Sequence, residues 1–193
     1  MKIVHPSFEI LEFPENSIET IELAARTCYK SEDKITKGSA EKLVRHLINR
    51  GHDAMLEFCD ATVKVVCDRG VTHEIVRHRI ASYAQESSRY CDYGKLGVKF
   101  IVPSDFKLDD TDVTFLSECE RQYNRCLEKG RTPQQARYFL PNGLKTEIVM
   151  KMNFREWRHF FSLRTAQAAH PDMRNLFKHV QSEFRLRVPI IFE

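Results

Sequence analysis

The chain has 193 residues, a length that suits a single domain over residues 1–193. Hydrophobic residues make up 42% of the chain and charged residues 30%, which provides for a core and excludes wholesale disorder. The formal net charge of +3 is too small to indicate a nucleic-acid-binding protein by itself.

No apolar run in the chain is long enough to cross a bilayer, so we expect no membrane partner. The first residues lack the apolar stretch of a signal peptide, and we therefore predict a cytoplasmic protein. The six cysteines form no CxxC pair, so we expect reduced, mostly buried thiols and no metal site.

Two helices are predicted near the start of the chain. Residues 18–30 carry apolar side chains at helical spacing, which predicts the first helix. Ser39 is the expected N-cap of the second helix, and Gly51 ends that helix just beyond its C-cap.

A strand, a short helix and a second strand are expected next. Residues 58–67 are rich in β-branched side chains and predict a strand, and residues 68–70 predict a turn. We expect Thr72 to cap a short helix that runs into an arginine-rich segment. Residues 98–102 predict the second strand, which Pro103 ends.

The second half of the chain contains more helix signals. Residues 113–129 are amphipathic and predict a helix that Gly130 closes. Thr132, followed by Pro133 and by Gln135 three residues after the threonine, predicts the start of another helix.

The last predicted elements are a strand and two helices. Residues 144–152 alternate like a strand, and we expect Asn153 to cap a helix that extends to Arg164. Pro171 is predicted to start the final helix, and residues 188–192 are predicted to be extended. Because helix and strand signals alternate irregularly, the sequence predicts an α+β fold.

The arginine-rich segment, residues 77–90, has the composition of an anion-binding site. It holds three arginines, one histidine, three serines and one glutamine, with Glu86 as its one acidic residue. Arginine matches phosphate oxygens in a bidentate geometry, and serine hydroxyls complete such sites. The alternative is a solvated basic face. Apolar residues such as Ile80 and Tyr83 interrupt the charges, which favours a partly buried ligand site.

Further candidate residues lie downstream. Arg164 shares one face of its predicted helix with aromatic residues, and is either functional or an ordinary cation at a helix end. For Arg137 the default interpretation is a surface arginine. Arg155 and His159 are four residues apart on one helix face, and Asn153 is sufficiently explained as an N-cap.

Several known motifs are excluded. His73 and His78 are five residues apart, whereas zinc proteases need histidines four apart on one helix face. The isolated His52-Asp53 pair is weak evidence for a metal-dependent phosphohydrolase. The chain contains neither GxGxxG nor the Walker A sequence, so dinucleotide-binding modes based on those loops are not expected.

The sequence does resemble one family. Arg77-His78-Arg79 followed after seven residues by Ser87 resembles the RHR-x7-S signature of the flavin-dependent thymidylate synthases. The resemblance extends in order over about residues 20 to 180. It also includes His52 with Glu57, Ala136-Arg137 with Leu140-Pro141, Asn153-x-Arg155 and Leu163-Arg164.

This resemblance implies the function and the assembly. Members of the family make dTMP from dUMP, take the one-carbon unit from methylenetetrahydrofolate, and use FAD that NADPH reduces. The implied fold is a single α+β domain with a central antiparallel sheet flanked by helices. The implied assembly is a homotetramer with active sites shared between subunits. No nucleic-acid partner is implied.

The resemblance also implies roles for individual residues. Arg164 would be catalytic, acting on the uracil ring. Cofactor-binding residues would be His52, Ala54, Arg77, His78, Arg79, Gln85, Asn153, Arg155 and His159. Substrate-binding residues would be Glu74, Arg77, Gln85, Glu86, Ser87, Ser88, Arg89, Arg137 and Arg164. No metal ligand is implied.

The chain departs from the family pattern at a few positions. Ala84-Gln85 stands where many members have Asn-Glu, and Phe58 stands where a histidine often follows the glutamate. Glu74 replaces a glutamine of some members, and His159 an asparagine. All of the arginines in the matching motifs are retained.

Three alternatives remain open at the level of sequence. One is a different flavin or nucleotide enzyme that shares the phosphate-binding segment. Another is an RNA- or DNA-binding module in which Tyr83 and Tyr90 stack on bases, which predicts strongly salt-dependent binding and no flavin. The third is a structural dimer module, which would leave Arg164 without a function.

Overall fold

The computed structural model describes residues 1–193, which pack as two compact units. Unit 1 consists of Met1–Phe8, Lys64–Arg77 and Tyr83–Val149, and unit 2 of Glu9–Val63, His78–Ser82 and Met150–Glu193. Several strands contribute residues to both units. The expectation of one domain over 1–193 therefore stays a prediction.

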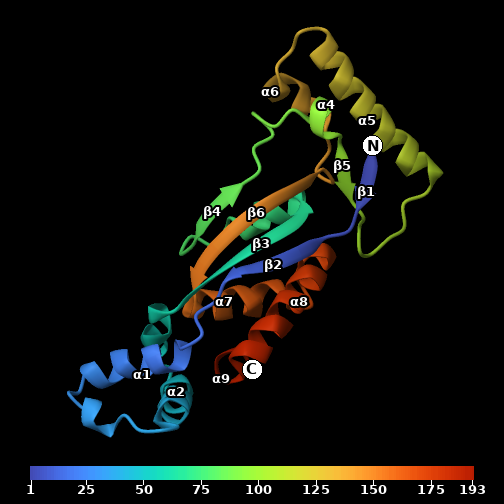
Figure 1. The fold of residues 1–193 in the computed structure, drawn as a ribbon. Helices are drawn as coiled ribbons and strands as arrows, with labels where there is room; N and C mark the ends of the chain where they lie inside the picture. The colour runs from blue at the N-terminus through green and yellow to red at the C-terminus, as the bar shows by residue number, and fades with distance from the viewer. The chain divides into compact units, whose positions relative to one another are not determined.

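The main sheet has four strands in the order β2-β3-β6-β4, and neighbouring strands run in opposite directions (Figure 1). Its strands are β2 Ser7–Glu12, β3 Asp60–Asp68, β6 Lys145–Asn153 and β4 Ser82–Gln85. Side chains along β3 and β6 alternate between buried and more exposed positions, as expected for strands with one packed face. The predicted α+β fold with an antiparallel sheet and flanking helices is confirmed.

Unit 1 contains a small parallel pair of strands that is separate from the main sheet. β1 Lys2–Val4 pairs with β5 Lys99–Ile101. The helices of unit 1 are α3 Arg69–Ile75, α4 Tyr93–Leu96, α5 Asp110–Glu128 and α6 Pro133–Ala136, with the 3-10 turn η3 Arg137–Phe139. The core of this part is formed by Tyr93, Val98, Phe100, Tyr123, Cys126, Ala136 and Leu144.

The helix ends in unit 1 follow local chemistry. Asp109 and Asp112 form a capping box at the start of α5, and Gly130 follows its end with a φ of 77°. Thr132 forms the predicted capping box of α6 with Gln135.

The prediction that Thr72 caps α3 is wrong. The cap is Asp68, whose carboxylate accepts the backbone N–H of Val71 at 2.8 Å, so the helix includes the predicted turn residues.

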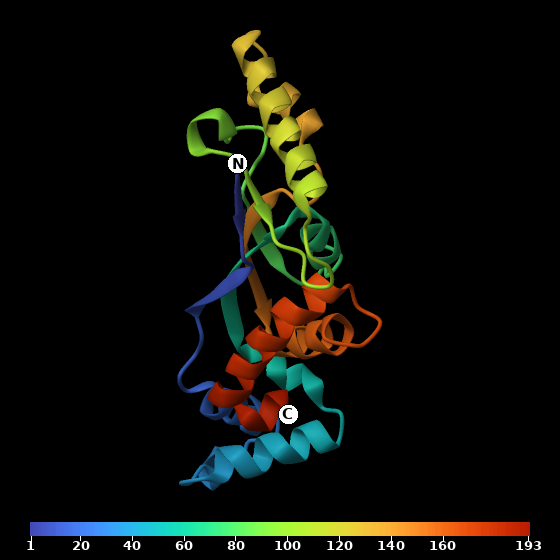
Figure 2. The ribbon, with the colours of Figure 1, turned by 90° about the vertical axis from the view of Figure 1, so that its right-hand side faces the viewer.

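Unit 2 contains a helical layer built around aromatic side chains. Its helices are α1 Ser17–Thr27, α2 Ser39–Asn49, α7 Phe154–Arg164, α8 Pro171–Arg187 and α9 Pro189–Phe192, with 3-10 turns η1 Glu32–Lys34 and η2 Asp53–Phe58. Figure 2 shows α8 beside α7. Between them Trp157, Phe160, Phe161, Phe177 and Phe184 are buried and pack ring against ring. This core holds the start of α7 in place.

Two other local predictions for unit 2 are wrong. Ser39 is the first residue of α2 and Gly38, with a φ of 79°, is its N-cap, because the Ser39 hydroxyl bonds instead to Thr36 and Glu22. Within residues 188–192, predicted from the sequence to be extended, Pro189–Phe192 form the short helix α9, because Pro189 suits the first helical position and Phe192 is buried.

The cysteines are all free, and Cys59, Cys67 and Cys126 are buried. No helix has the length and hydropathy to span a membrane.

Candidate functional site

His78 lies between a carboxylate and a guanidinium in unit 2. Its Nδ1 is 2.8 Å from Oε1 of Glu156, and its Nε2 is 3.1 Å from Nε of Arg164. His78 and Glu156 are buried, with relative exposures of 5% and 7%. Both partners come from α7, whose start is fixed by Asn153 accepting the backbone N–H of Glu156 at 2.9 Å.

The surroundings of His78 favour its neutral form. Burial lowers the pKa of His78, the hydrogen bond with Glu156 acts in the opposite direction, and the charge of Arg164 lowers it further, so that the net shift is downward. The His78 ring also packs against Phe160, at a centroid distance of 4.6 Å, and against His159, at 5.6 Å. The ring is therefore held on two sides by packing and at both nitrogens by hydrogen bonds.

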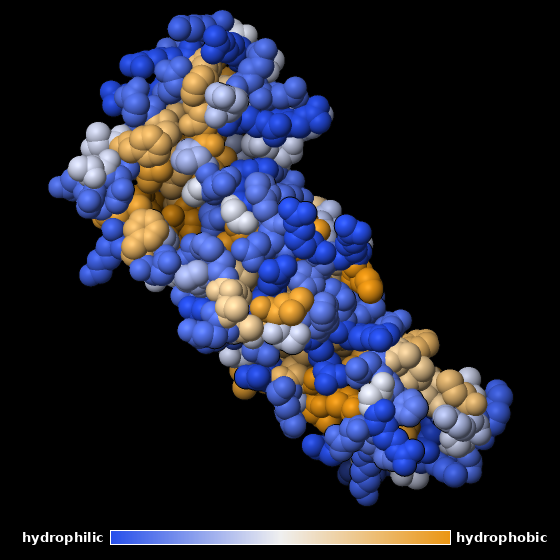
Figure 3. All heavy atoms as spheres, turned by 180° about the vertical axis from the view of Figure 1, so that it is seen from behind, coloured by the Kyte–Doolittle hydropathy of each residue, from blue (hydrophilic) through white to orange (hydrophobic).

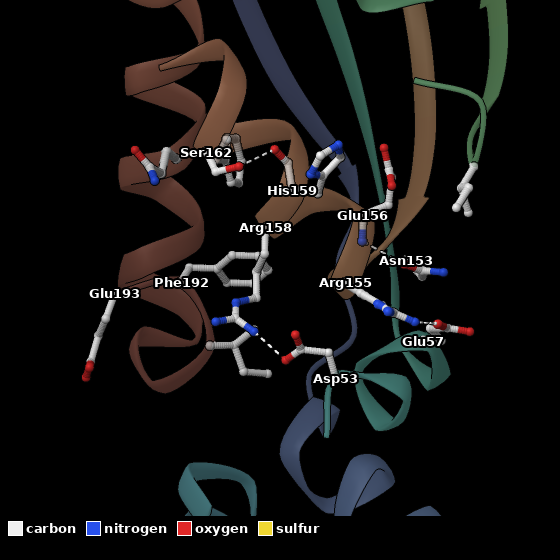
Figure 4. Close-up of a pocket in the computed structure, with 14 residues that line it drawn as sticks. Asp53, Glu57, Asn153, Arg155, Glu156, Arg158, His159, Ser162, Phe192 and Glu193 are labelled. Atoms are coloured by element: carbon white, nitrogen blue, oxygen red, sulfur yellow. Dashed lines mark hydrogen bonds and ion pairs between the residues drawn. The ribbon is translucent and has the colours of Figure 1, made fainter. Parts of the chain in front are cut away.

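A cavity of about 770 Å³ opens beside α7 in unit 2. Three predicted cofactor-binding residues, Asn153, Arg155 and His159, line it (Figure 4). Arg158 also lines the cavity. The apolar part of the lining comes from Ile80, Phe161, Ile191 and Phe192.

The arginines of this cavity are held by carboxylates. Arg155 donates to Glu57 at 2.6 Å, and Arg158 donates to Asp53 at 2.8 Å, as Figure 4 shows. Each of these contacts uses one of the five N–H groups of a guanidinium. The arginines can thus be oriented by their carboxylates and still donate to a second anion.

The lining offers two guanidinium groups and apolar walls, which suit a flavin dinucleotide, but it also carries four carboxylates, those of Asp53, Glu57, Glu156 and Glu193. A pyrophosphate requires forked donors such as those of Arg155 and Arg158, and an aromatic ring system requires apolar walls such as those of Phe161 and Phe192. The carboxylates of Asp53 and Glu57 compete with an anionic ligand for the arginines.

A second cavity of unit 2, of about 520 Å³, is lined by the predicted residues His52 and Ala54. Its ionisable basic side chains are arginines, a lysine and histidines, and no aspartate or glutamate lines it. The basic side chains are Arg26, Lys34, His46, Arg50 and His52. The rest of the lining is mostly apolar and includes Leu43 and Leu47 of α2 and Met55 of η2. The donor set again suits an anionic ligand with an apolar portion.

Unit 1 contains the remaining anion-binding candidates. Arg137, at the start of η3, donates from Nη1 to Oγ of Ser88 at 3.0 Å. The carbonyl of Ser87 accepts the N–H groups of Tyr90, at 3.0 Å, and Cys91, at 2.9 Å, which forms a turn around the serines. Arg89 is exposed and donates to Gln134 at 2.9 Å. The structure thus joins two motifs that are 49 residues apart in the chain.

Three other predicted substrate residues lie in unit 1 with different surroundings. The Gln85 amide donates to the hydroxyls of Thr72, at 3.0 Å, and Thr146, at 3.3 Å. Glu86 accepts from Lys145 at 2.9 Å. Glu74 is half-buried on α3. The assignment of all three side chains to the substrate stays a prediction.

The family model described as "Thymidylate synthase complementing protein" matches residues 9–190. The flavin-dependent thymidylate synthase of Pyrococcus furiosus is 32% identical over 180 residues, which cover 86% of this chain and 74% of the relative. This chain belongs to the flavin-dependent thymidylate synthase family. The corresponding protein of Corynebacterium aurimucosum is 31% identical over 206 residues and covers 96% and 83% of the two chains.

A solved structure shares the fold of this family member. The UMP/dUMP methylase PolB from Streptomyces cacaoi, bound with 5-Br dUMP, has a TM-score of 0.84 and a sequence identity of 22%. The similarity covers 100% of this chain and 95% of that chain. The predicted family and enzyme class are therefore confirmed, and the roles of individual residues stay predictions.

The RHR motif of this family member divides between the units. Arg77 belongs to unit 1 and donates from Nε to the carbonyl of His73 at 3.2 Å. His78 and Arg79 belong to unit 2, where the histidine is buried and the arginine is exposed. Within unit 2 the structure brings His78, His159 and Arg164 together, as the sequence alone could not show.

Sequence reasoning missed Glu156 and Arg158 as site residues. Glu156 is the third residue of α7, a position where a glutamate is common for reasons of local helix structure alone. The partner of its carboxylate, His78, is 78 residues away in the chain. Buried glutamates almost always have a charged or hydrogen-bonding partner. A glutamate on the apolar side of α7 therefore indicates that such a partner lies nearby.

Proposed function

We propose that this chain converts dUMP to dTMP, with methylenetetrahydrofolate as the one-carbon donor and FAD, reduced by NADPH, as the source of hydride. Membership of the flavin-dependent thymidylate synthase family supports the reaction. The distribution of arginines and serines in the two units supports the binding of several anionic groups.

The hydrogen bond between Arg137 and Ser88 is the observation that carries this proposal. It joins the arginine of one family-like motif to the serine beside Ser87 of another, with a distance of 3.0 Å. A half-buried arginine already held by a hydroxyl loses little conformational freedom when it binds an anion. We assign Arg137, Ser87, Ser88 and Arg89 to the phosphate of dUMP.

Arg164 is the proposed catalytic residue. A fixed guanidinium beside the uracil ring stabilises negative charge that develops on the ring during carbon transfer. The contact between Arg164 and His78 supports this role, because it restricts the orientation of a long side chain.

Five of the residues proposed for the flavin line the two cavities of unit 2. Asn153, Arg155 and His159 line one cavity, and His52 and Ala54 line the other. When bound, the flavin supplies the reducing equivalents that turn a one-carbon methylene unit into a methyl group. The chain supplies the arginines that bind the phosphates and the apolar walls that exclude water.

A homotetramer with shared sites is part of the proposal. Apolar side chains are exposed at Leu96, Phe115 and Tyr138 in unit 1, with relative exposures of 62%, 62% and 85%. Figure 3 shows apolar surface among the hydrophilic surface of the protein. Such patches indicate contact surfaces, and contacts with further copies would cover them.

The visible absorbance of the purified protein, after addition of FAD and desalting, tests the proposal. We expect a retained flavin spectrum that shifts when dUMP is added, because the proposed reaction requires both ligands to be bound together. The Arg137→Ala variant should retain the flavin and lose the shift at the same dUMP concentration. A colourless protein, or a flavin spectrum indifferent to dUMP at any concentration, would contradict the proposal.

A further inference from the structure

The contacts of His78 define where its proton resides. A neutral imidazole has one N–H donor and one acceptor nitrogen. Nε of Arg164 carries a hydrogen and has no lone pair to accept with, so at 3.1 Å it must donate to Nε2 of His78. The proton of the neutral ring is then on Nδ1, where Oε1 of Glu156 accepts it at 2.8 Å.

The other protonation states are disfavoured by the same contacts. If the proton were on Nε2, an N–H group of His78 would face the N–H group of Arg164, and the lone pair of Nδ1 would face the carboxylate of Glu156. If both nitrogens were protonated, the conflict with Arg164 would remain. The downward shift of the His78 pKa, caused first by burial, agrees with a neutral ring.

We propose that Glu156 is a positioning residue for Arg164 and acts through His78. The Glu156 carboxylate selects the Nδ1–H tautomer, and the Nε2 lone pair of His78 then anchors Arg164. This inference rests on the proposed catalytic role of Arg164. Capping of α7 by Asn153 uses the backbone N–H of Glu156 and not its carboxylate. The carboxylate is therefore not needed for the helix start, and the proposal gives it a separate role.

The hydrogen bond at Nε restricts how the Arg164 side chain can rotate. The guanidinium is planar, so an acceptor fixed at Nε sets the plane in which the terminal nitrogens lie. The His78 ring cannot follow a rotation of Arg164, because it is buried and packs against Phe160. The terminal N–H groups are therefore presented in one orientation.

The same three-residue environment could suggest a metal site instead. His78, Glu156 and His159 each place a ligand atom within 4.8 Å of the others. A metal ligand must offer a lone pair, and the one lone pair of neutral His78 accepts from Arg164. The guanidinium also places a positive charge beside any bound cation. The hydrogen-bonded relay is therefore favoured over the metal.

The tautomer of His78 can be measured directly. Full-length protein labelled with nitrogen-15 in its histidines, with and without FAD, gives separate ring signals, and a His78→Gln variant assigns those of His78. We expect Nδ1 of His78 to be protonated and Nε2 to be unprotonated at pH 7.5. In Glu156→Met the carboxylate acceptor is lost, and we expect the Nε2–H tautomer to increase by more than tenfold relative to the Nδ1–H tautomer.

Two further variants separate positioning from folding. Glu156→Gln keeps an oxygen that can accept from Nδ1, so it should largely preserve the tautomer and restore most of the activity. Glu183→Gln removes a partly exposed charge on α8, where Glu183 pairs with Arg187, and should change neither the tautomer of His78 nor the activity. For Glu156→Met we expect kcat for dTMP formation to fall about tenfold with little change in KM for dUMP. That pattern is expected when Arg164 is misoriented in the transition state but substrate binding is unchanged.

The outcomes distinguish this inference from the proposed function. An unchanged His78 tautomer in a folded Glu156→Met variant would overturn the relay, whatever the activity. A wild-type His78 with its proton on Nε2 would overturn it as well, as would stoichiometric Zn²⁺ binding that displaces Arg164. A wild-type protein with the Nδ1–H tautomer but no dTMP formation would support the relay and contradict the proposed function instead.

Discussion

Arg164 donates from Nε to Nε2 of His78 at 3.1 Å, which joins the end of α7 to the central histidine of the RHR motif. The two residues are 86 positions apart in the chain. Their contact turns two separate sequence signals, a basic segment and an arginine on an aromatic helix face, into one structural arrangement within unit 2.

Replacing Arg164 with alanine should lower turnover strongly while flavin remains bound. Removing one electrostatic donor from a transition state costs on the order of 10²–10³-fold in kcat, and we expect a loss of that size. Initial rates of dTMP formation and the flavin absorbance of the same sample provide the measurement. Loss of flavin in parallel with activity would show that Arg164 serves the cofactor instead.

The same substitution should change the titration of His78. The positive charge of Arg164 contributes to the lowered pKa of His78, after the larger effect of burial. Arg164→Ala should therefore raise the pKa of His78 relative to wild type. A nitrogen-15 titration of the labelled histidines measures it. A pKa of His78 that falls or stays the same in this variant would contradict the electrostatic interpretation of the contact.

Arg137→Ala should weaken dUMP binding without affecting the flavin. A hydrogen bond with a charged partner contributes about 1.5–3 kcal/mol, so we expect KM for dUMP to rise by roughly 10- to 100-fold. Steady-state kinetics at saturating folate and NADPH measure this change. Arg121→Ala is the matched control, because Arg121 is an exposed arginine that pairs with Glu118 on α5. Equal effects of the two substitutions would argue against a specific phosphate contact.

Glu147 should make stability depend on pH in acid. Hydrogen bonds from Lys145 and Lys64 lower its pKa from 4.5 to about 2. Because the folded-state pKa is depressed, the stabilisation is present above pH 4.5 and is lost as the pH falls toward 2. Glu147→Gln should therefore be less stable than wild type at pH 6, and the difference should shrink at pH 3.

Urea unfolding of both proteins at the two pH values measures the effect. Glu118→Gln, which changes a more exposed carboxylate on α5, is the control and should show a smaller difference. A difference between wild type and Glu147→Gln that grows as the pH falls would have the wrong sign for this account.

Asn153 should stabilise the protein through its cap. Its side chain accepts the N–H of Glu156 at 2.9 Å, and loss of such a cap costs about 1 kcal/mol. Asn153→Ala should lower the free energy of unfolding by that amount, whereas Asn153→Asp should retain it because aspartate also caps. Thermal unfolding of the three proteins without flavin gives the comparison. Equal losses in both variants would mean that the amide has another structural task.

The helices could be predicted from the sequence because their signals are local. Thr132 with Gln135, and Asn153 with Glu156, carry their capping chemistry within a few residues, and the structure places each cap there. The error at Ser39 arose because a serine hydroxyl can bond elsewhere, here to Glu22, which is 17 residues away.

Contacts between distant segments could not be predicted from the sequence. The pairing of β1 with β5 joins Ile3 to Phe100, and no local pattern indicates that register. Glu156 likewise gave no sign of its contact with His78. The motifs shared with the family identified most candidate residues. Which of their side chains contact one another could be seen only in the three-dimensional structure.

Conversion of dUMP by the full-length protein, with FAD, NADPH and methylenetetrahydrofolate labelled with carbon-13 in its methylene group, tests the central claim most directly. Mass spectrometry of the nucleotide product should show dTMP with the label in its methyl group, and its formation should require NADPH and FAD. Unchanged dUMP in the complete mixture, from a protein that has retained its flavin, would contradict the account.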